Sequence, residues 1–410
     1  MKIANERQIM VFDLDFDGHH ANYIQHLIEY WCQKKLLGNL YIVVSPEFAV
    51  QRPQVAQIAQ VAQKYHVHLV PITKEEQATL RPKETAVDRK LRNFQEWGLL
   101  YRYALQLKAV HCVVMYLDTF FFSLACGVNA PCDFSGIYFR PTFHYDEFAN
   151  YLPSKKERIQ QWLEKLILSR VLSNPKLKTL LCLDPFVVKH LKGFRTEAEI
   201  VHLPDPVLSD CTREIQENNL GNQLKIAPDK KVFLLFGSLS QRKGIFQLLQ
   251  SIELLPVELC PHLCLLLVGQ TPLQEQTKID VEIERISRSY SVQIIKNYQY
   301  ISEADVRAYF QLADVVLAPY QNHVGMSGIL LLAASNQKPV LSTDYGLMGE
   351  VVRRYQLGLT VNSTIPREIA RGITQFIRQS PDRLCDFEQM KTFAEQNSVE
   401  NFARTIFQHL

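Results

Sequence analysis

The sequence has little of what would place it in a membrane, secreted or nucleic-acid-binding class. It contains no apolar run near the roughly 18 residues that a membrane-spanning helix needs. Its opening stretch, MKIANERQIMVFDLD, has charged residues where a secretion signal has an apolar core. No CxxC pair occurs among its nine cysteines, so we expect buried free thiols and a reducing, cytoplasmic compartment. The net charge of +3 is too small to indicate nucleic acid as a partner.

Candidate metal ligands are also scarce. Cys260 and Cys264 flank His262 in CPHLC, where we favour buried thiols over a zinc site. His19 and His20 are adjacent, and neighbouring histidines in a turn seldom point at one ion. We therefore expect no metal and no other cofactor.

The sequence does contain short apolar runs that alternate with helical patterns. In the first half these runs are 8–14, 40–45, 67–72, 111–118, 136–140, 179–184 and 199–205, and in the second half 231–239, 263–269, 292–297, 314–320, 338–343 and 357–362. Continuous apolarity is typical of parallel strands that are covered on both faces. Helical patterns lie between the runs, for example over 243–255 and 302–312. The alternation predicts two doubly wound, Rossmann-like α/β domains.

A polar stretch over 208–230 separates the two sets and predicts a linker. We therefore expect a first domain over 1–207 and a second domain over 231–390. Ligands of such sheets bind at the carboxyl ends of the strands. The cleft between two such domains is accordingly the expected site.

The turn after the first expected strand, DFDGHHANYIQHL, is the first candidate binding element. Gly18 permits a tight turn, and His19 and His20 then stand at a helix start, where free N–H groups attract anions. The alternative is that a histidine only caps the helix. Further along, Arg140 and His144 follow an expected strand end in SGIYFRPTFHYDEF, together with Asp146 and Glu147. These side chains either face the cleft or belong to a surface loop.

The matching turn of the second half is FGSLSQRKGIFQLLQ. Gly237 ends a strand, and Arg242 and Lys243 precede a helix, which is a suitable cradle for a diphosphate. Surface Lys-Gly pairs are common, so this segment is weak evidence alone. Other segments of the second half strengthen it: Gly269 after a strand, Ser302 with Asp305 as a helix cap, and Gly325, Ser327 and Gly328 at a helix start without bulky side chains.

The ordered segments GSLSQRKG, LLVG, YISEADVRAYFQLADVVLAPY, MSGILLLAASNQKPVLSTDYGLMGEVV and GLTV resemble the donor-binding domain of retaining glycosyltransferases of the GT-B fold, family 4 type. The resemblance covers about 230–365. GHHANYIQHL is similar to the first turn of that family's acceptor domain, and HLPDPV to its hinge. The segment 391–410, with SVENFARTIF, is similar to the family's closing helix, which crosses back to the first domain.

The resemblance implies roles for individual residues. Lys243 would hold the donor diphosphate, with Arg242 in place of the arginine that usually follows the first glycine, here Ser238. The other donor-side positions that it implies are Gly237, Gly269, Tyr298, Ser327, Gly328, Gly346 and Glu350. The family's Glu-x7-Glu motif is divergent, because Val324 and Leu332 stand near the positions of its two glutamates. Asp118, near the place of an acceptor-domain histidine, or a histidine of the first turn would position the acceptor.

The resemblance therefore implies an enzyme that transfers a sugar from a nucleoside-diphosphate sugar to a glycan, lipid or small-molecule acceptor, with retention of configuration. Ribose recognition would be weaker than in the family unless Asn322 or Ser335 compensates. One alternative is an inactive protein that binds sugars or nucleotides. Another is an inverting transferase or epimerase with Asp118 or His144 as base.

One segment outside these motifs, 152–172, has a capping box of Ser154 and Glu157 and apolar residues at helical spacing. The apolar positions are Ile159, Trp162, Leu163, Leu166 and Ile167, and the basic ones Lys155, Lys156, Arg158, Lys165 and Arg170. Across 155–195, 10 basic residues stand against 3 acidic ones. Such a helix either lies on an anionic membrane surface or packs on the sheet with a solvated face.

Overall fold

The computed structural model describes residues 7–148, 150–206 and 220–410. These form two compact units, each with its own parallel sheet, so the expected α/β class is confirmed. Unit 1 holds the residues up to His144, then Pro153–Pro206 and Val399–Leu410. Unit 2 holds Tyr145–Leu152 and the residues from Leu220 to Ser398. The expected linker, 208–230, lies outside the described residues as far as residue 219, and its remainder includes the short helix α9 (Leu220–Gln223).

Unit 1 contains a seven-stranded parallel sheet in the order β3-β2-β1-β4-β5-β6-β7. Its strands are β1 (Gln8–Phe12), β2 (Asn39–Val44), β3 (Val67–Pro71), β4 (His111–Val114), β5 (Asp133–Tyr138), β6 (Leu177–Cys182) and β7 (Glu199–His202). Its helices are α1 (His20–Lys34), α2 (Phe48–Gln51), α3 (Pro53–Ala62), α4 (Lys74–Thr79), α5 (Ala86–Gln106), α6 (Phe121–Ala125), α7 (Lys155–Leu172), α8 (Val188–Leu191) and α17 (Val399–Gln408).

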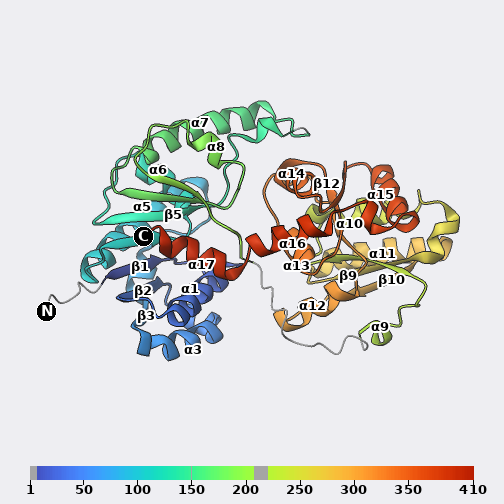
Figure 1. The fold of residues 1–410 in the computed structure, drawn as a ribbon, viewed down its shortest axis with the longest axis horizontal. Helices are drawn as coiled ribbons and strands as arrows, with labels where there is room; N and C mark the ends of the chain where they lie inside the picture. Colours follow the sequence, from blue (N-terminus) through green and yellow to red (C-terminus); the bar gives the residue numbers. More distant parts are fainter. Residues whose placement is uncertain (1–6, 149, 207–219) are drawn as a thin grey trace. The chain divides into compact units, whose positions relative to one another are not determined.

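Both faces of this sheet are covered, as the continuous apolarity of the strands predicts. One core packs α1, α3 and α17 against the sheet, and the other packs α5, α6, α7 and α8 against the opposite face (Figure 1). The expected closing segment, 391–410, contains the end of α16 (Phe387–Gln396) in unit 2 and all of α17 in unit 1.

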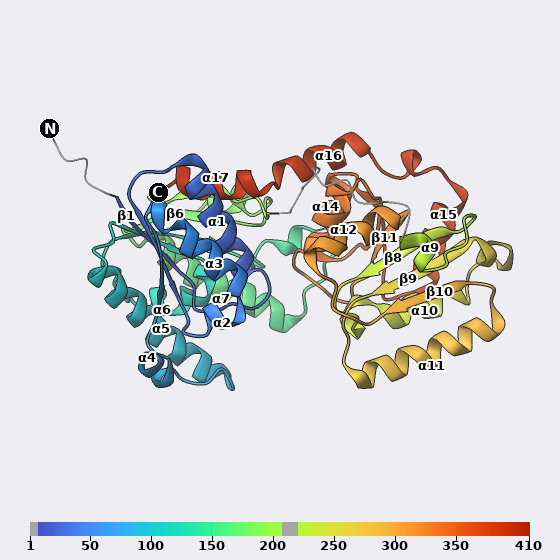
Figure 2. The same ribbon diagram turned by 90° about the horizontal axis from the view of Figure 1, so that it is seen from below.

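Unit 2 contains a six-stranded parallel sheet in the order β10-β9-β8-β11-β12-β13. Its strands are β8 (Lys231–Phe236), β9 (Leu263–Val268), β10 (Gln293–Asn297), β11 (Val315–Ala318), β12 (Val340–Thr343) and β13 (Gly358–Val361). Its other helices are α10 (Ile245–Ile252), α11 (Leu273–Ser289), α12 (Glu303–Leu312), α13 (Gly328–Ser335), α14 (Gly346–Arg354) and α15 (Pro366–Arg378). Helices α10, α11 and α15 share one core on one face of the sheet, and α12, α14 and α16 lie toward the other face (Figure 2).

The sheet order fixes where a ligand can be bound in each unit. In unit 1 the strand order reverses between β1 and β4, and in unit 2 it reverses between β8 and β11. The loops that leave such neighbouring strands diverge to opposite faces and leave a crevice at the carboxyl edge. The loops after β1, β4, β8 and β11 contain Gly18 and His19, Asp118, Gly237–Lys243 and Ser327, and His20 begins α1 directly after the first of them.

Candidate functional site

The turn after β8 in unit 2 folds back over its own strand. Lys243 is 7% exposed, and its Nζ donates a hydrogen bond of 2.6 Å to the carbonyl oxygen of Phe236. Gly237 has a φ of +100°, and a Cβ at this position would lie 2.5 Å from Lys243 Nζ. A Cβ at Gly269 would in turn overlap the carbonyl oxygen of Gly237. The two glycines are therefore needed to let the lysine head lie at the end of the strand.

The helix expected over 243–255 begins later than the sequence suggests. A single 3-10 turn, Gln241–Lys243, precedes α10, and Gly244 joins them with a φ of +74°. A Cβ at Gly244 would overlap the carbonyl oxygen of Pro319. The backbone of this turn thus touches the segment after β11, which brings the two loops of the crevice together.

Tyr320 is the residue on which the two cations converge. The Arg242 guanidinium carbon lies 5.3 Å from the centre of its ring, and Lys243 Nζ lies 5.1 Å from it. Within the described parts of the chain, neither cation forms an ion pair with a carboxylate. Burying a cation without a counter-charge is costly, so an anionic ligand at this point would stabilise the site.

The start of α13 adjoins this pair of cations. The hydroxyl groups of Tyr320 and Ser327 lie 3.1 Å apart, and Ser327 is the N-cap residue of α13 without a side-chain capping bond. Gly328, the first residue of the helix, is exposed and has no atom within 4 Å of a Cβ built on it. The first turn of α13 therefore offers unobstructed backbone N–H groups to an anion.

His323 completes this group, although no motif in the sequence singles it out. Its Nε2 lies 3.1 Å from the carbonyl oxygen of Met326, so Nε2 carries the proton and donates it there. Its Nδ1, which lies 3.4 Å from Arg242 Nη1, then accepts from the guanidinium. The structure thus brings Gly237, Arg242, Lys243 and Ser327 together through Tyr320 and His323, two residues that sequence reasoning missed.

The turn before α14 lies against the same loop. Gly346 has a φ of +61°, and a Cβ there would lie 2.7 Å from the carbonyl oxygen of Val324. Leu347 N donates to that oxygen at 2.9 Å. Glu350, in the middle of α14, forms ion pairs with Arg353 and Arg354 on its own helix, at 3.2 and 3.3 Å.

Two other donor-side candidates make contacts of their own. The Tyr298 hydroxyl donates to Asp280 on α11 at 2.7 Å, and burial, followed by this bond, raises the pKa of Tyr298. The Ser335 hydroxyl donates to the carbonyl oxygen of Leu332 at 3.1 Å. Asn322 is exposed and has a φ of +50°. The Ser302 hydroxyl donates to Asp305, not to the backbone, so the expected side-chain cap of α12 is absent.

In unit 1, the two histidines after β1 do not cap α1. His19 is the N-cap residue but makes no side-chain capping bond. His20 Nδ1 lies 2.7 Å from Asp13, which is buried at the end of β1. Burial raises the pKa of Asp13, and the bond and charge of His20 oppose this shift. Gly18 permits the turn with a φ of +60°.

Aromatic rings extend this group across the carboxyl ends of β4 and β5. The ring of Tyr116 stacks on His20 at 4.0 Å and on Phe139 at 3.8 Å, and its hydroxyl is hydrogen-bonded to His19 Nε2. Burial, with the charges of His20 and Arg140, lowers the pKa of His19 to about 4. His19 is therefore neutral at pH 7.

Asp118 follows β4 in a short 3-10 turn and borders this group. Burial raises its pKa to about 6, while the backbone N–H groups of Asp118 and Phe139 and the charge of Arg140 oppose the shift. Its Oδ1 is buried and has no hydrogen-bond partner among the described residues. A buried carboxylate oxygen without a partner is suited to a ligand hydroxyl group. Arg140 is exposed at the end of β5.

Tyr23 and Asp205 are further members that sequence reasoning missed. The Tyr23 hydroxyl donates to Asp205 Oδ1, and the Tyr23 ring lies 4.9 Å from the ring of His19. Burial raises the pKa of Asp205 to about 6, and the bond from Tyr23 opposes the shift. His19 and Tyr23 are four residues apart, about one helical turn, and this spacing could have indicated that they are neighbours.

His144 is the candidate that the structure separates from this group. It is 2% exposed, and its Nε2 lies 3.1 Å from Asp184 Oδ2, which is also buried. The surface-loop alternative is wrong at His144, and this burial does not support direct contact with an acceptor. Asp146 and Glu147 are exposed in a 3-10 turn (Tyr145–Glu147) that belongs to unit 2.

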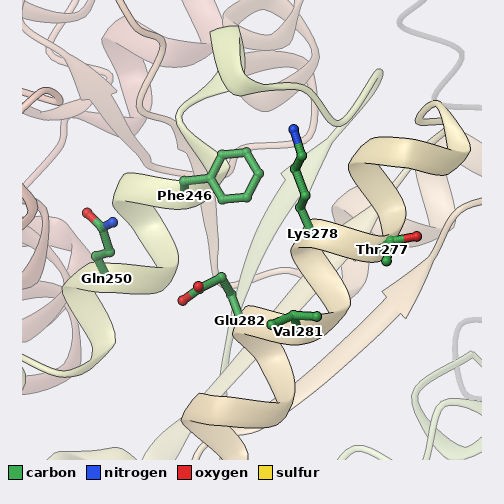
Figure 3. Close-up of a pocket in the computed structure, with 6 residues that line it drawn as sticks. All are labelled: Phe246, Gln250, Thr277, Lys278, Val281 and Glu282. Carbon is green, nitrogen blue, oxygen red and sulfur yellow. The ribbon is translucent and has the colours of Figure 1, made fainter.

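A groove of about 400 Å³ lies elsewhere in unit 2, between α10 and α11. Figure 3 shows its lining residues on these two helices: Phe246, Gln250, Thr277, Lys278, Val281 and Glu282. None of the predicted site residues lines it. Over the described part of the chain, no three His, Cys, Asp or Glu side chains are grouped to hold a metal ion. Nor does any helix there have the length and apolarity to cross a bilayer.

Comparisons with known proteins concern the fold and the second half of the chain. Residues 216–397 match the family model described as glycosyl transferases group 1. No match was found among curated proteins. Among solved structures, Anabaena HepE in complex with UDP is similar over 98% of each chain, with a TM-score of 0.66 and 14% identity. Sucrose-phosphate synthase from Thermosynechococcus elongatus is similar over 98% of each chain, with a TM-score of 0.66 and 15% identity.

A third similar structure is WaaG, a glycosyltransferase involved in lipopolysaccharide biosynthesis, with a TM-score of 0.62 and 14% identity over 97% of this chain and 98% of WaaG. At these identities the similarity to solved structures concerns the fold. The chain therefore has the GT-B fold, and the match over residues 216–397 supports a glycosyltransferase enzyme.

Proposed function

We propose that this protein transfers a sugar from a nucleoside-diphosphate sugar to an acceptor, with retention of anomeric configuration, as the family 4 resemblance implies. The observation that carries the donor assignment is the buried Lys243, which lies beside Arg242 and has no carboxylate partner among the described residues. Both cations adjoin the open first turn of α13 through Tyr320 and Ser327. This combination suits a diphosphate, which offers several oxygens to several donors.

The chemistry that follows is stabilisation of a leaving group. As the bond from the sugar to the donor phosphate breaks, negative charge grows on the diphosphate. Lys243, Arg242 and the N–H groups at Ser327–Gly328 would stabilise this charge in place, without rearrangement. We propose no metal ion for this step, because the two side-chain cations supply the positive charge. UDP is the first nucleotide to test, because the similar structure of HepE contains it.

The acceptor is assigned to unit 1, where polar and aromatic groups meet at the ends of β1, β4 and β5. Asp118 Oδ1 would accept a hydrogen bond from the acceptor hydroxyl, and the rings of His19, Tyr116 and Phe139 would pack against the acceptor. In retention, the acceptor attacks on the face that the diphosphate leaves, and a phosphate oxygen takes the acceptor proton. The acceptor class remains a glycan, a lipid or a small molecule.

A second candidate is an inverting transferase with Asp118 as general base. The observation in its favour is the pKa of about 6 at Asp118, which approaches the value that suits a base near neutral pH. A third candidate is a protein that binds the nucleotide without turnover, because Leu332 and Val324 replace the motif glutamates.

The test is incubation with UDP-, GDP- and ADP-sugars, with release of the nucleoside diphosphate and the product anomer followed by NMR. Retention predicts that donor and product share the anomeric configuration, whereas the opposite anomer would establish the inverting candidate. Binding of nucleotide without release, with any donor and acceptor, would establish the non-catalytic candidate. Lys278→Ala is the control variant, because Lys278 is an exposed lysine of unit 2 outside the proposed pocket.

A further inference from the structure

Helix α7 in unit 1 is oriented by polar side chains on its inner side. Gln161 Nε2 donates to the carbonyl oxygen of Thr142 at 3.0 Å. Glu164 accepts from Thr142 N at 3.1 Å and from Thr142 Oγ1 at 2.6 Å, and the Tyr138 hydroxyl also donates to Glu164. In the last turns the inner positions become apolar and buried at Leu168, Val171 and Leu172. These contacts fix which side of the helix faces the sheet.

The outer side of α7 is apolar in the turns that follow its first, charged turn. Ile159 is 60% exposed, Trp162 59%, Leu163 44% and Leu166 46%. Their spacings of one, three and four residues place them on one face of the helix. Helix α7 runs along the outside of unit 1 (Figure 1). Isolated exposed apolar residues are normal, but a continuous apolar face indicates a binding surface.

The charges of α7 are divided between the same two sides. Its basic residues are all exposed: Lys155, Lys156, Arg158, Lys165 and Arg170. Its two acidic residues are engaged elsewhere, Glu157 in the capping box with Ser154 and Glu164 with Thr142. The outer side therefore combines apolar residues with basic ones and presents no free carboxylate from this helix. An apolar protein partner alone would not explain five basic residues around the face.

We propose that the outer face of α7 binds to the surface of an anionic lipid bilayer. Trp162, Ile159 and Leu166 would enter the region between headgroups and acyl chains, and the basic residues would contact the phosphates. The helix would lie parallel to the surface, since an amphipathic helix buries only its apolar side. This surface is independent of the donor pocket, so the proposal stands or fails separately from the transferase activity.

The three tryptophans of the chain provide a direct readout. Trp31 is 1% exposed and Trp97 is 2% exposed, so Trp162 is the tryptophan that solvent or lipid can reach. The full-length protein is mixed with vesicles of phosphatidylcholine alone or with 30% phosphatidylglycerol. Only the anionic vesicles should shift the emission to shorter wavelength and protect it from acrylamide. High salt should weaken this binding, because it screens the basic residues.

Vesicle flotation of variants then separates the two parts of the surface. Lys155→Gln with Lys156→Gln should weaken binding to anionic vesicles about 30-fold, from the typical contribution of basic residues near a charged surface. Ile159→Ser with Trp162→Ser should weaken it roughly tenfold or more. Leu273→Ser and Lys278→Gln, at exposed positions on α11 of unit 2, are matched controls and should bind as wild type.

Three results would overturn the proposal. The first is an unchanged Trp162 emission with anionic vesicles at low salt. The second is flotation of the α7 variants at the wild-type level. The third is an oligomer that forms without lipid and dissociates in Trp162→Ser, which would make the outer face of α7 a protein–protein contact. Circular dichroism and urea unfolding of the same variants serve as the folding check, because the substituted side chains are exposed.

Discussion

Replacement of Gly237 by alanine tests whether the position of Lys243 matters for the donor. The new Cβ would lie 2.5 Å from Lys243 Nζ, so the lysine head must move from its bond with the carbonyl oxygen of Phe236. The movement itself is cheap, because Nζ is the end of a flexible chain. The effect of the movement on UDP binding is larger, because a charge-assisted hydrogen bond from Lys243 to the diphosphate contributes about 1.5–3 kcal/mol. UDP affinity should therefore fall between about 10-fold and 100-fold.

Because Gly237 has a positive φ, alanine at this position also lowers the free energy of unfolding, so a control variant with the same cost is needed. A residue with a Cβ in the left-handed region costs about 1–2 kcal/mol of stability. Gly127 has a φ of +88° and no atom within 4 Å of a Cβ built on it, so Gly127→Ala carries this cost without a clash. Calorimetric titration with UDP and urea unfolding should show similar losses of stability in both variants but weaker binding only in Gly237→Ala. Equal UDP affinity of Gly237→Ala and wild type would refute the reasoning.

Further outcomes are expected at other positions. Leu332→Glu should improve UDP affinity or leave it intact in the same titration, and a large loss would contradict the family layout of α13. Asp118 has a folded pKa of about 6, above its ordinary value of 3.8, so its contribution to stability is present below pH 4 and is lost as the pH rises to about 6. Asp118→Asn should remove part of the fall in unfolding free energy between pH 4 and 6, and an unchanged pH profile in urea unfolding would contradict this. His144→Ala removes one partner of a buried pair with Asp184 and should cost ~3 kcal/mol of unfolding free energy without weakening UDP binding.

The strand pattern could be predicted from the sequence because burial on both faces makes each strand a continuous apolar run. Each of the thirteen expected runs overlaps a strand of the structure. The ends of the strands were harder to predict, because apolar and aromatic residues that follow a strand lengthen the apolar run. Tyr116 and Tyr320 were both placed in strands, but β4 ends at Val114 and β11 at Ala318.

The contacts between site residues could not be predicted, because they depend on which strands are neighbours in the sheet and not on the sequence around each residue. Tyr116 meets His20 and Phe139 because β4 lies between β1 and β5, and sheet order is a long-range property. Tyr320 stands at the end of an apolar run, which gave no sign of a binding role. In the structure Arg242 and Lys243 both lie over its ring. The glycine turns were easier to predict, because positive φ and close backbone approach favour glycine at one position in the sequence.

Burial was predicted wrongly where a distant partner decides it. His144 follows a strand, so the sequence predicted a side chain that faces the cleft or lies in a surface loop. In the structure it is buried beside Asp184, which follows β6.

For α7 the apolar spacing left open a membrane surface or packing on the sheet. The helix does pack on the sheet through Leu168, Val171 and Leu172. In its earlier turns Gln161 and Glu164 occupy the inner side through Thr142, which the apolar pattern alone did not predict.

The most direct test of the central claim is calorimetric titration of UDP into wild type, Lys243→Met and Lys278→Met. Methionine keeps an apolar stem of similar length and removes the ammonium group, with its charge and its hydrogen bond to Phe236. Because Lys243 is the buried cation at the proposed diphosphate site, the account predicts that Lys243→Met binds UDP at least tenfold more weakly than wild type. Lys278→Met should bind as wild type does. Wild-type affinity in a folded Lys243→Met protein would contradict the donor assignment on which the proposed function depends.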